Sequence, residues 1–232
     1  MRKPFVFLDL DDTILDFHWA ERNALRQTLM KAGIAPTEEL LSRYSELNRQ
    51  QWELLEEGKL TREQVLLRRF ELLFEERGIR ASAPEIRDDY EYRLSIGHRF
   101  MPNAEETLKK LHARVHLYLA SNGSAAVQAG RLASSGIRPY FQDIFISEEI
   151  GAEKPTEEYF RRCFSRIPDF SPELAMIVGD SLTSDIRGGI RAGIKTCWVN
   201  PQGKPGRSDI IPEFEIQNLA ELPPLLEAVF NL

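Results

Sequence analysis

The sequence of 232 residues has few of the features that mark specialised classes of protein. Its two cysteines, Cys163 and Cys197, lie far apart, so they indicate neither a disulfide framework nor a cysteine metal site. We expect free, mostly buried thiols in a reducing compartment. Basic residues are not in excess, and the formal net charge of −6 argues against a nucleic-acid polymer as partner.

Long hydrophobic runs are also missing. The first apolar stretch, residues 5–8, follows Arg2 and Lys3 but stops at Asp9, which is too short for a signal peptide or a membrane span. Repeats and low-complexity segments are absent, and the four histidines are not spaced as metal ligands. We therefore expect a cytoplasmic protein that does not enter a membrane.

Residues 1–15 and 98–232 show short apolar strands, and in the second of these segments the strands alternate with helices. Strands are expected at 5–8, 115–120, 144–146, 174–178 and 196–199. Helices are expected at 104–112, 125–135, 157–166, 184–192 and 219–230. This alternation predicts an α/β fold, in which a parallel sheet carries helices on both faces.

Residues 16–97 show a different, wholly helical pattern. Helical stripes follow the N-cap candidates Asp16, Thr37, Thr61 and Ser82, and glycines end several of them. We therefore predict a core domain made of residues 1–15 and 98–232, with a helical domain of residues 16–97 inserted after the first strand.

Two aspartates, Asp9 and Asp11, follow the first predicted strand directly. In open α/β sheets this carboxyl edge is where ligands bind. Residues two apart on extended backbone face the same way, so both carboxylates can face one site. Like charges this close repel unless a cation or a proton is present, and Mg²⁺ with oxygen ligands would satisfy them.

Four polar clusters, each at the end of a predicted strand or in a following loop, carry the chemistry. They are residues 9–13, residues 121–123, residues 154–155 and residues 179–185. Together they supply paired carboxylates, a hydroxyl with nearby backbone N–H groups, one ammonium and further carboxylates. Phosphoryl transfer requires such a nucleophile, proton shuttle, metal site and set of donors.

In this order the clusters resemble the haloacid dehalogenase superfamily, in its phosphatase branch. Members carry Asp-x-Asp-x-Thr, then Ser or Thr, then Lys, then Gly-Asp-x-x-x-x-Asp, and this chain matches each motif. The resemblance implies a Rossmann-like core with an inserted, mobile helical cap. It also implies a magnesium-dependent phosphomonoester hydrolase that works through an aspartyl phosphate.

The resemblance assigns the central chemistry to three aspartates. Asp9 would be the nucleophile, and Asp11 the general acid that protonates the leaving oxygen and then activates water. Asp180 would bind Mg²⁺ together with the Asp9 carboxylate and the Asp11 carbonyl oxygen. Asp11 argues against a dehalogenase, because that reaction needs no acid for an alkoxide leaving group and the family's dehalogenases lack this residue.

The same resemblance gives five residues supporting roles. Ser121 and the backbone N–H of Asn122 would hold phosphate oxygens, and Lys154 would neutralise the nucleophile and the phosphate. Thr13 would support its loop through hydrogen bonds. Asp185 would orient metal-bound water or Lys154.

Within the helical insertion, Asn48-x-x-x-Trp52, Gly58 and Arg69-Phe70 resemble the cytosolic pyrimidine 5'-nucleotidase group, as do core segments between residues 184 and 198. The implied substrate is a small phosphorylated metabolite of the nucleoside 5'-monophosphate class. Phe17, Trp19 and Trp52 are candidates for stacking on the base, with ordinary helix packing as the alternative for each.

Other functions remain open at this point. A phosphomutase of the β-phosphoglucomutase type would share the core and cap but pass the phosphoryl group to a second sugar hydroxyl. A general sugar-phosphate phosphatase and a non-catalytic nucleotide-binding protein are further alternatives. We expect a monomer or a homodimer.

Overall fold

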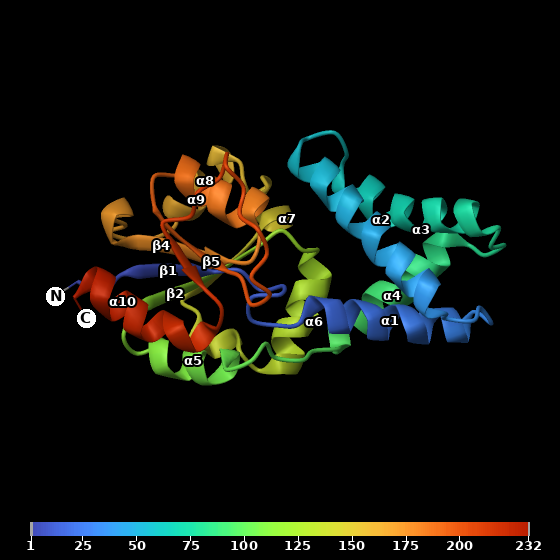
Figure 1. Cartoon of the computed structure of the whole chain (residues 1–232), viewed down its shortest axis with the longest axis horizontal. Helices are drawn as coiled ribbons and strands as arrows, with labels where there is room; N and C mark the ends of the chain where they lie inside the picture. The colour runs from blue at the N-terminus through green and yellow to red at the C-terminus, as the bar shows by residue number, and fades with distance from the viewer. Residues whose placement is uncertain (1, 232) are drawn as a thin grey trace. The chain divides into compact units, whose positions relative to one another are not determined.

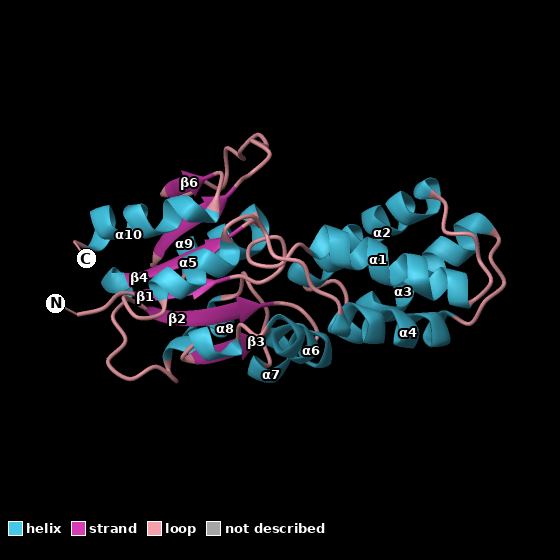
Figure 2. Cartoon of the chain, turned by 90° about the horizontal axis from the view of Figure 1, so that it is seen from below, coloured by secondary structure: helices cyan, strands magenta, loops and turns pink. Residues whose placement is uncertain are grey.

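The computed structural model describes residues 2–231, which form two compact units. One unit runs up to Asp16 and resumes at Arg99, and the other spans Phe17–His98. Figure 2 shows the strands in the first unit and only helices and loops in the second. Across the described residues, no helix has both the length and the apolar character needed to cross a membrane.

The first unit is built on one sheet of six parallel strands, in the order β3-β2-β1-β4-β5-β6. The strands are β1 (Phe5–Leu8), β2 (His116–Ser121), β3 (Asp143–Ile146), β4 (Ala175–Gly179), β5 (Lys195–Val199) and β6 (Phe214–Ile216). The sequence predicted the first five, but it did not predict β6, which has only three residues and therefore little pattern to recognise.

Side chains of β1 alternate between the two faces of the sheet, and helices cover both faces. Val6 and Leu8 pack into one apolar cluster, whereas Phe5 and Phe7 pack into another. Figure 1 shows α5 and α10 on one side of the sheet and α8 and α9 on the other. The predicted α/β fold with helices on both faces is confirmed.

The helices of the sheet unit are α5 (Ala104–Leu111), α6 (Ala125–Ser135), α7 (Ser147–Ile150), α8 (Glu157–Phe164), α9 (Arg187–Arg191) and α10 (Leu222–Phe230). Short turns are η1 (Arg138–Tyr140), η2 (Pro172–Leu174), η3 (Leu182–Ile186) and η4 (Leu219–Glu221). Both cysteines are free and buried, as predicted.

Two predicted helices differ from the structure at their first turns. The helix expected at 184–192 is a five-residue π turn, η3, followed by α9, because the Ser181 hydroxyl accepts from the Ser184 N–H and fixes the start of the turn. The helix expected at 219–230 begins as η4, and α10 then carries Pro223 and Pro224, which have no N–H to extend the earlier turn.

The second unit consists of α1 (Phe17–Lys31), α2 (Glu38–Glu56), α3 (Arg62–Arg77) and α4 (Ala83–Ile96). Thr61 caps α3 as predicted, and it forms a capping box in which Thr61 and Gln64 each accept from the other's backbone N–H. Tyr44, Phe70 and Tyr90 form an aromatic core, with ring centroids 5.0–5.5 Å apart.

Candidate active site

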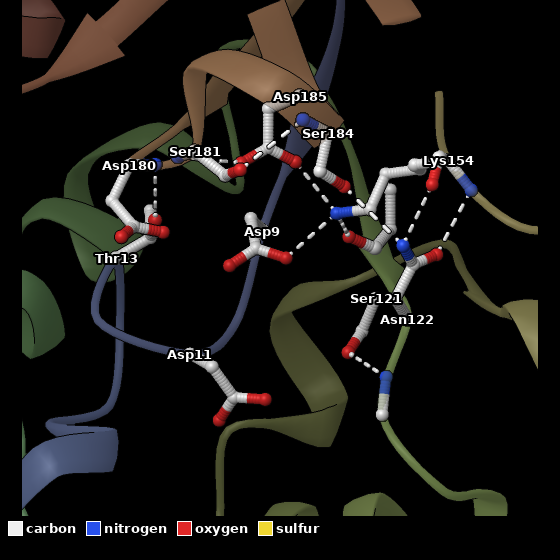
Figure 3. A network of polar contacts seen from close by, with 12 residues as sticks. Asp9, Asp11, Thr13, Ser121, Asn122, Lys154, Asp180, Ser181, Ser184 and Asp185 are labelled. Atoms are coloured by element: carbon white, nitrogen blue, oxygen red, sulfur yellow. Dashed lines mark hydrogen bonds and ion pairs between the residues drawn. The ribbon is translucent and has the colours of Figure 1, made fainter. Parts of the chain in front are cut away.

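The carboxyl ends of three neighbouring strands bring distant segments together. β1 ends before Asp9, β2 ends at Ser121, and β4 ends before Asp180. Because the strands are parallel and adjacent, these residues meet at one edge of the sheet, where Figure 3 shows them around a common space. Lys154 joins them from the loop between α7 and α8.

The Lys154 ammonium group lies at the centre of this network and is almost fully buried. Its Nζ donates to Asp9 Oδ1 at 2.7 Å, to Asp185 Oδ1 at 2.6 Å and to the carbonyl oxygen of Ala120 at 2.6 Å. Burial lowers the pKa of Lys154, but the carboxylates of Asp185 and Asp9 outweigh this and raise it. Lys154 is therefore a fixed positive charge beside Asp9.

Negative charge exceeds positive charge around Lys154. Oxygens of Asp9, Asp180 and Asp185 all lie within 4.8 Å of one another. Burial raises the pKa of Asp9 and of Asp180, and the neighbouring carboxylates raise both further. The buried carboxylates of Asp9 and Asp185, the half-buried carboxylate of Asp180 and one ammonium fit a hard divalent cation with oxygen ligands, of which Mg²⁺ is an example.

Hydrogen bonds tie the site loops to one another. The Thr13 hydroxyl accepts from the Asp180 N–H at 3.1 Å, which links the loop after β1 to the loop after β4. The two oxygens of Asp185 are divided between Lys154 Nζ and the Ser181 N–H. Asp185 thereby holds the lysine in place and stabilises the loop that carries Asp180.

The side chain of Asn122 has a role that the sequence reasoning did not identify. Its Nδ2 donates to the Lys154 carbonyl oxygen at 2.8 Å, and its Oδ1 accepts from the Lys154 N–H at 2.9 Å. This two-point contact fixes the backbone of Lys154, whereas the family resemblance implied a function only for the backbone N–H of Asn122.

Two residues of α6, Gln128 and Arg131, were also missed, and both contact Asp11. Each is buried on the core-facing side of its helix. The available signal was their position: the helix begins directly after the loop of Ser121, and its buried side contains a glutamine and an arginine at i and i+3.

The candidate base-stacking residues all belong to the helical unit. Phe17 and Trp19 lie on α1 and are half-buried. Trp52 on α2 is also half-buried; its Nε1 donates to Asn48 Oδ1 at 3.1 Å, and the guanidinium of Arg62 lies 5.6 Å from its ring centroid. Their part in substrate binding stays a prediction.

Comparison with known proteins finds one matching family and several relatives that cover most of this chain. The haloacid dehalogenase-like hydrolase family matches residues 5–193. The chain is 43% identical to the HAD-hydrolase YfnB of Bacillus subtilis over 217 residues, which cover 94% of this chain and 92% of YfnB. It is 36% identical to the pyrimidine 5'-nucleotidase PynA of Streptococcus pneumoniae over 219 residues, covering 94% and 92% of the two chains.

Two further matches extend over nearly the whole chain. The pyrimidine 5'-nucleotidase YjjG of Escherichia coli is 27% identical over 226 residues, covering 97% of this chain and 99% of YjjG. A crystal structure of YfnB bound to magnesium superposes with a TM-score of 0.92 at 42% identity, covering 97% of this chain and 99% of that one.

Proposed function

Because this chain belongs to the haloacid dehalogenase-like hydrolases, we propose that it is a phosphoric monoester hydrolase whose nucleophile is Asp9 and whose substrates are nucleoside 5'-monophosphates. Its sheet edge supplies the groups that such a reaction needs: a buried carboxylate, a fixed ammonium, hydroxyl and amide donors, and a second aspartate.

The reaction begins with attack of an Asp9 carboxylate oxygen on phosphorus. As that bond forms, the bond between phosphorus and the ester oxygen breaks, and Asp11 gives its proton to the departing oxygen. Asp11 then takes a proton from a water molecule, which attacks phosphorus and releases inorganic phosphate and the free Asp9 carboxylate.

Other side chains hold the charges in place during both steps. The Lys154 ammonium, 2.7 Å from Asp9 Oδ1, reduces repulsion between the carboxylate and the phosphate oxygens. Ser121 and the N–H of Asn122 would donate to phosphate oxygens. Asp9, Asp180 and the carbonyl oxygen of Asp11 would hold Mg²⁺, which, when bound, neutralises phosphate charge.

The observation that carries the proposal is the contact of Lys154 with both Asp9 and Asp185 inside a group of closely spaced carboxylates. This arrangement leaves a net negative site that a divalent cation and a phosphate ester can share. The general acid Asp11 next to it favours phosphate esters over haloacids as substrates.

The substrate class is inferred from two sources. Two relatives that cover nearly the whole chain are named pyrimidine 5'-nucleotidases. The helical unit, which we propose acts as a cap, would enclose only a small phosphorylated metabolite. The free, buried thiols of Cys163 and Cys197 lie in the sheet unit and are compatible with a location in the reducing cytoplasm.

A phosphate-release screen tests the proposal. Purified protein is incubated with UMP, dUMP, other nucleotides, sugar phosphates and phosphoglycolate, with Mg²⁺ and with EDTA. We expect the highest kcat/KM with pyrimidine nucleoside monophosphates, and loss of at least about 100-fold with EDTA. Asp9→Asn should abolish release, and Asp209→Asn, which alters an exposed ion pair outside the site, should leave it unchanged.

Two results would contradict parts of the proposal separately. Turnover that persists in EDTA would exclude the metal-dependent mechanism. A strong preference for sugar phosphates would retain the mechanism but reject the nucleotidase assignment. Isomerisation of glucose 1-phosphate, assayed in parallel, would identify a mutase.

A further inference from the structure

Two buried polar side chains of α6, Gln128 and Arg131, have no role in the chemistry described so far. Gln128 is 1% exposed and Arg131 is 0% exposed. Buried polar side chains in proteins normally make specific hydrogen bonds or ion pairs. Both of these side chains reach the carboxylate of Asp11.

Each residue contacts a different oxygen of that carboxylate. Gln128 Nε2 donates to Asp11 Oδ2 at 2.6 Å, and a terminal nitrogen of Arg131 lies 2.9 Å from Asp11 Oδ1. Gln128 therefore holds one carboxylate oxygen by a hydrogen bond, and Arg131 places its positive charge beside the other. In Figure 3 the Asp11 carboxylate points toward the Ser121 side of the site.

The same Gln128 nitrogen also donates to Ser121 Oγ at 2.9 Å. Ser121 Oγ accepts a second hydrogen bond, from the Gly123 N–H at 3.1 Å. A hydroxyl has two acceptor sites and one proton, so these two bonds leave the Ser121 proton as the group with which it can bind a ligand. Ser121 is thereby set as a donor, as a phosphate oxygen requires.

Gly123 makes this arrangement possible. A Cβ atom on Gly123 would lie 2.1 Å from Gln128 Nε2 and 2.7 Å from Gln128 Cδ. No side chain can be present at position 123 while the amide of Gln128 keeps its place. The absence of a side chain at Gly123 is therefore what allows the Gln128 amide of α6 to occupy this position.

We propose that Gln128 is a positioning residue that aligns the proton donor Asp11 with the phosphate-binding hydroxyl Ser121, while Arg131 places a positive charge beside the other carboxylate oxygen. This inference rests on the proposed phosphomonoesterase function. The inference predicts a different effect on two kinds of ester. Alignment of Asp11 matters for an ester with a poor, alkoxide-like leaving group, and much less for an ester whose leaving group departs without a proton.

The test compares two substrates in one set of variants. A nucleoside 5'-monophosphate has an alkoxide leaving group, whereas p-nitrophenyl phosphate releases a stable phenolate. We use kcat/KM, because it reports the step in which phosphorus is transferred to Asp9. Gln128→Met keeps the approximate volume of the side chain but has no amide, and Gly123→Ala displaces the amide without changing it.

We expect both variants to lower kcat/KM for both esters, because Ser121 binds the phosphate of each. The loss should be about 10-fold larger for the nucleotide, because only the nucleotide also needs the proton of Asp11. Gln142→Met, which alters an exposed glutamine elsewhere in the same unit, should change neither value. Thermal unfolding of each variant shows whether it is folded. One variant removes the amide and the other displaces it, so the test still stands if one of them does not fold.

Equal losses on both esters, or no loss on either, would overturn the inference. Absence of phosphate release by the unaltered protein would instead reject the proposed function. The two failures are therefore distinguishable in the same experiment.

Discussion

Removing the positive charge of Lys154 gives the most informative perturbation of this site. Lys154→Met retains most of the volume of the side chain but leaves Asp9 and Asp185 without their shared ammonium partner. The side chain is 1% exposed, so solvent cannot easily replace it. We expect the metal-free variant to be much less stable than the metal-free parent protein.

The magnitude follows from these contacts. With charge centres about 3.5 Å apart and an effective dielectric constant of about 20, each pair is worth roughly 5 kcal/mol before desolvation. Burying the ammonium costs several kcal/mol, which offsets part of this attraction. Removing one partner from a buried ion pair accordingly lowers the free energy of unfolding by about 3–5 kcal/mol.

The pH dependence of this loss has a definite sign. Burial raises the pKa of Asp9, and Lys154 opposes the rise. Without Lys154 the pKa of Asp9 in the folded protein is higher still. The Asp9 carboxyl therefore binds a proton more tightly in the folded protein than in the unfolded chain. The stability of the variant must therefore fall as pH rises from about 5.5 to about 8, and more steeply than that of the parent.

Urea denaturation in EDTA at these two pH values measures both effects. Lys195→Met is the matched control, because Lys195 forms an ion pair with Glu213 at 2.9 Å but is 31% exposed, and it should cost less than about 1 kcal/mol. A loss below about 1 kcal/mol for Lys154→Met at pH 8, or a larger loss at the acidic pH, would refute the reasoning.

Three further predictions concern the two units separately. Arg69→Met removes a 3%-exposed cation from the helical unit and should lower its free energy of unfolding by about 3–5 kcal/mol, whereas Arg77→Met, at a 34%-exposed ion pair, should cost less than about 1 kcal/mol in urea denaturation. Gly189→Ala places a Cβ 2.5 Å from a side chain of β4 and should cost about 1–3 kcal/mol in thermal unfolding, while Gly206→Ala meets nothing within 4 Å and should be neutral. Burial opposes ionisation of Asp89, yet hydrogen bonds from α1 and α4 lower its pKa to about 2, so Asp89→Asn should cost about 1–2 kcal/mol at pH 7. That difference should shrink as pH falls from about 4 to about 2 in acid titrations followed by circular dichroism, and a constant difference would contradict it.

Much of the fold could be predicted because its signals are local. β1 is a short apolar run that ends before Asp9, the starts of α2 and α3 follow the capping residues Thr37 and Thr61, and Gly78 ends α3. β6 and the π turn η3 could not be predicted, since the first is too short to show a pattern. The second depends on hydrogen bonds of Ser181 that only the folded loop reveals.

The site residues likewise fall into those that the sequence indicated and those that it did not. The motifs indicated the groups that lie at strand ends, because parallel topology fixes where those ends meet. The contacts of Gln128, Arg131 and the Asn122 side chain depend on which helix face is turned toward the loop and on side-chain reach. The sequence places a glutamine and an arginine three residues apart on the helix after the Ser121 loop, but their contacts are visible only in the folded structure.

The most direct test of the central claim is to trap the phosphorylated protein. Protein mixed with a ³²P-labelled nucleoside 5'-monophosphate and Mg²⁺ is quenched in acid within milliseconds, digested and mapped by mass spectrometry. We predict label on the peptide that contains Asp9, sensitive to hydroxylamine as an acyl phosphate is, and no label in Asp9→Asn. Turnover without any labelled peptide, or label on another residue, would contradict Asp9 as the nucleophile.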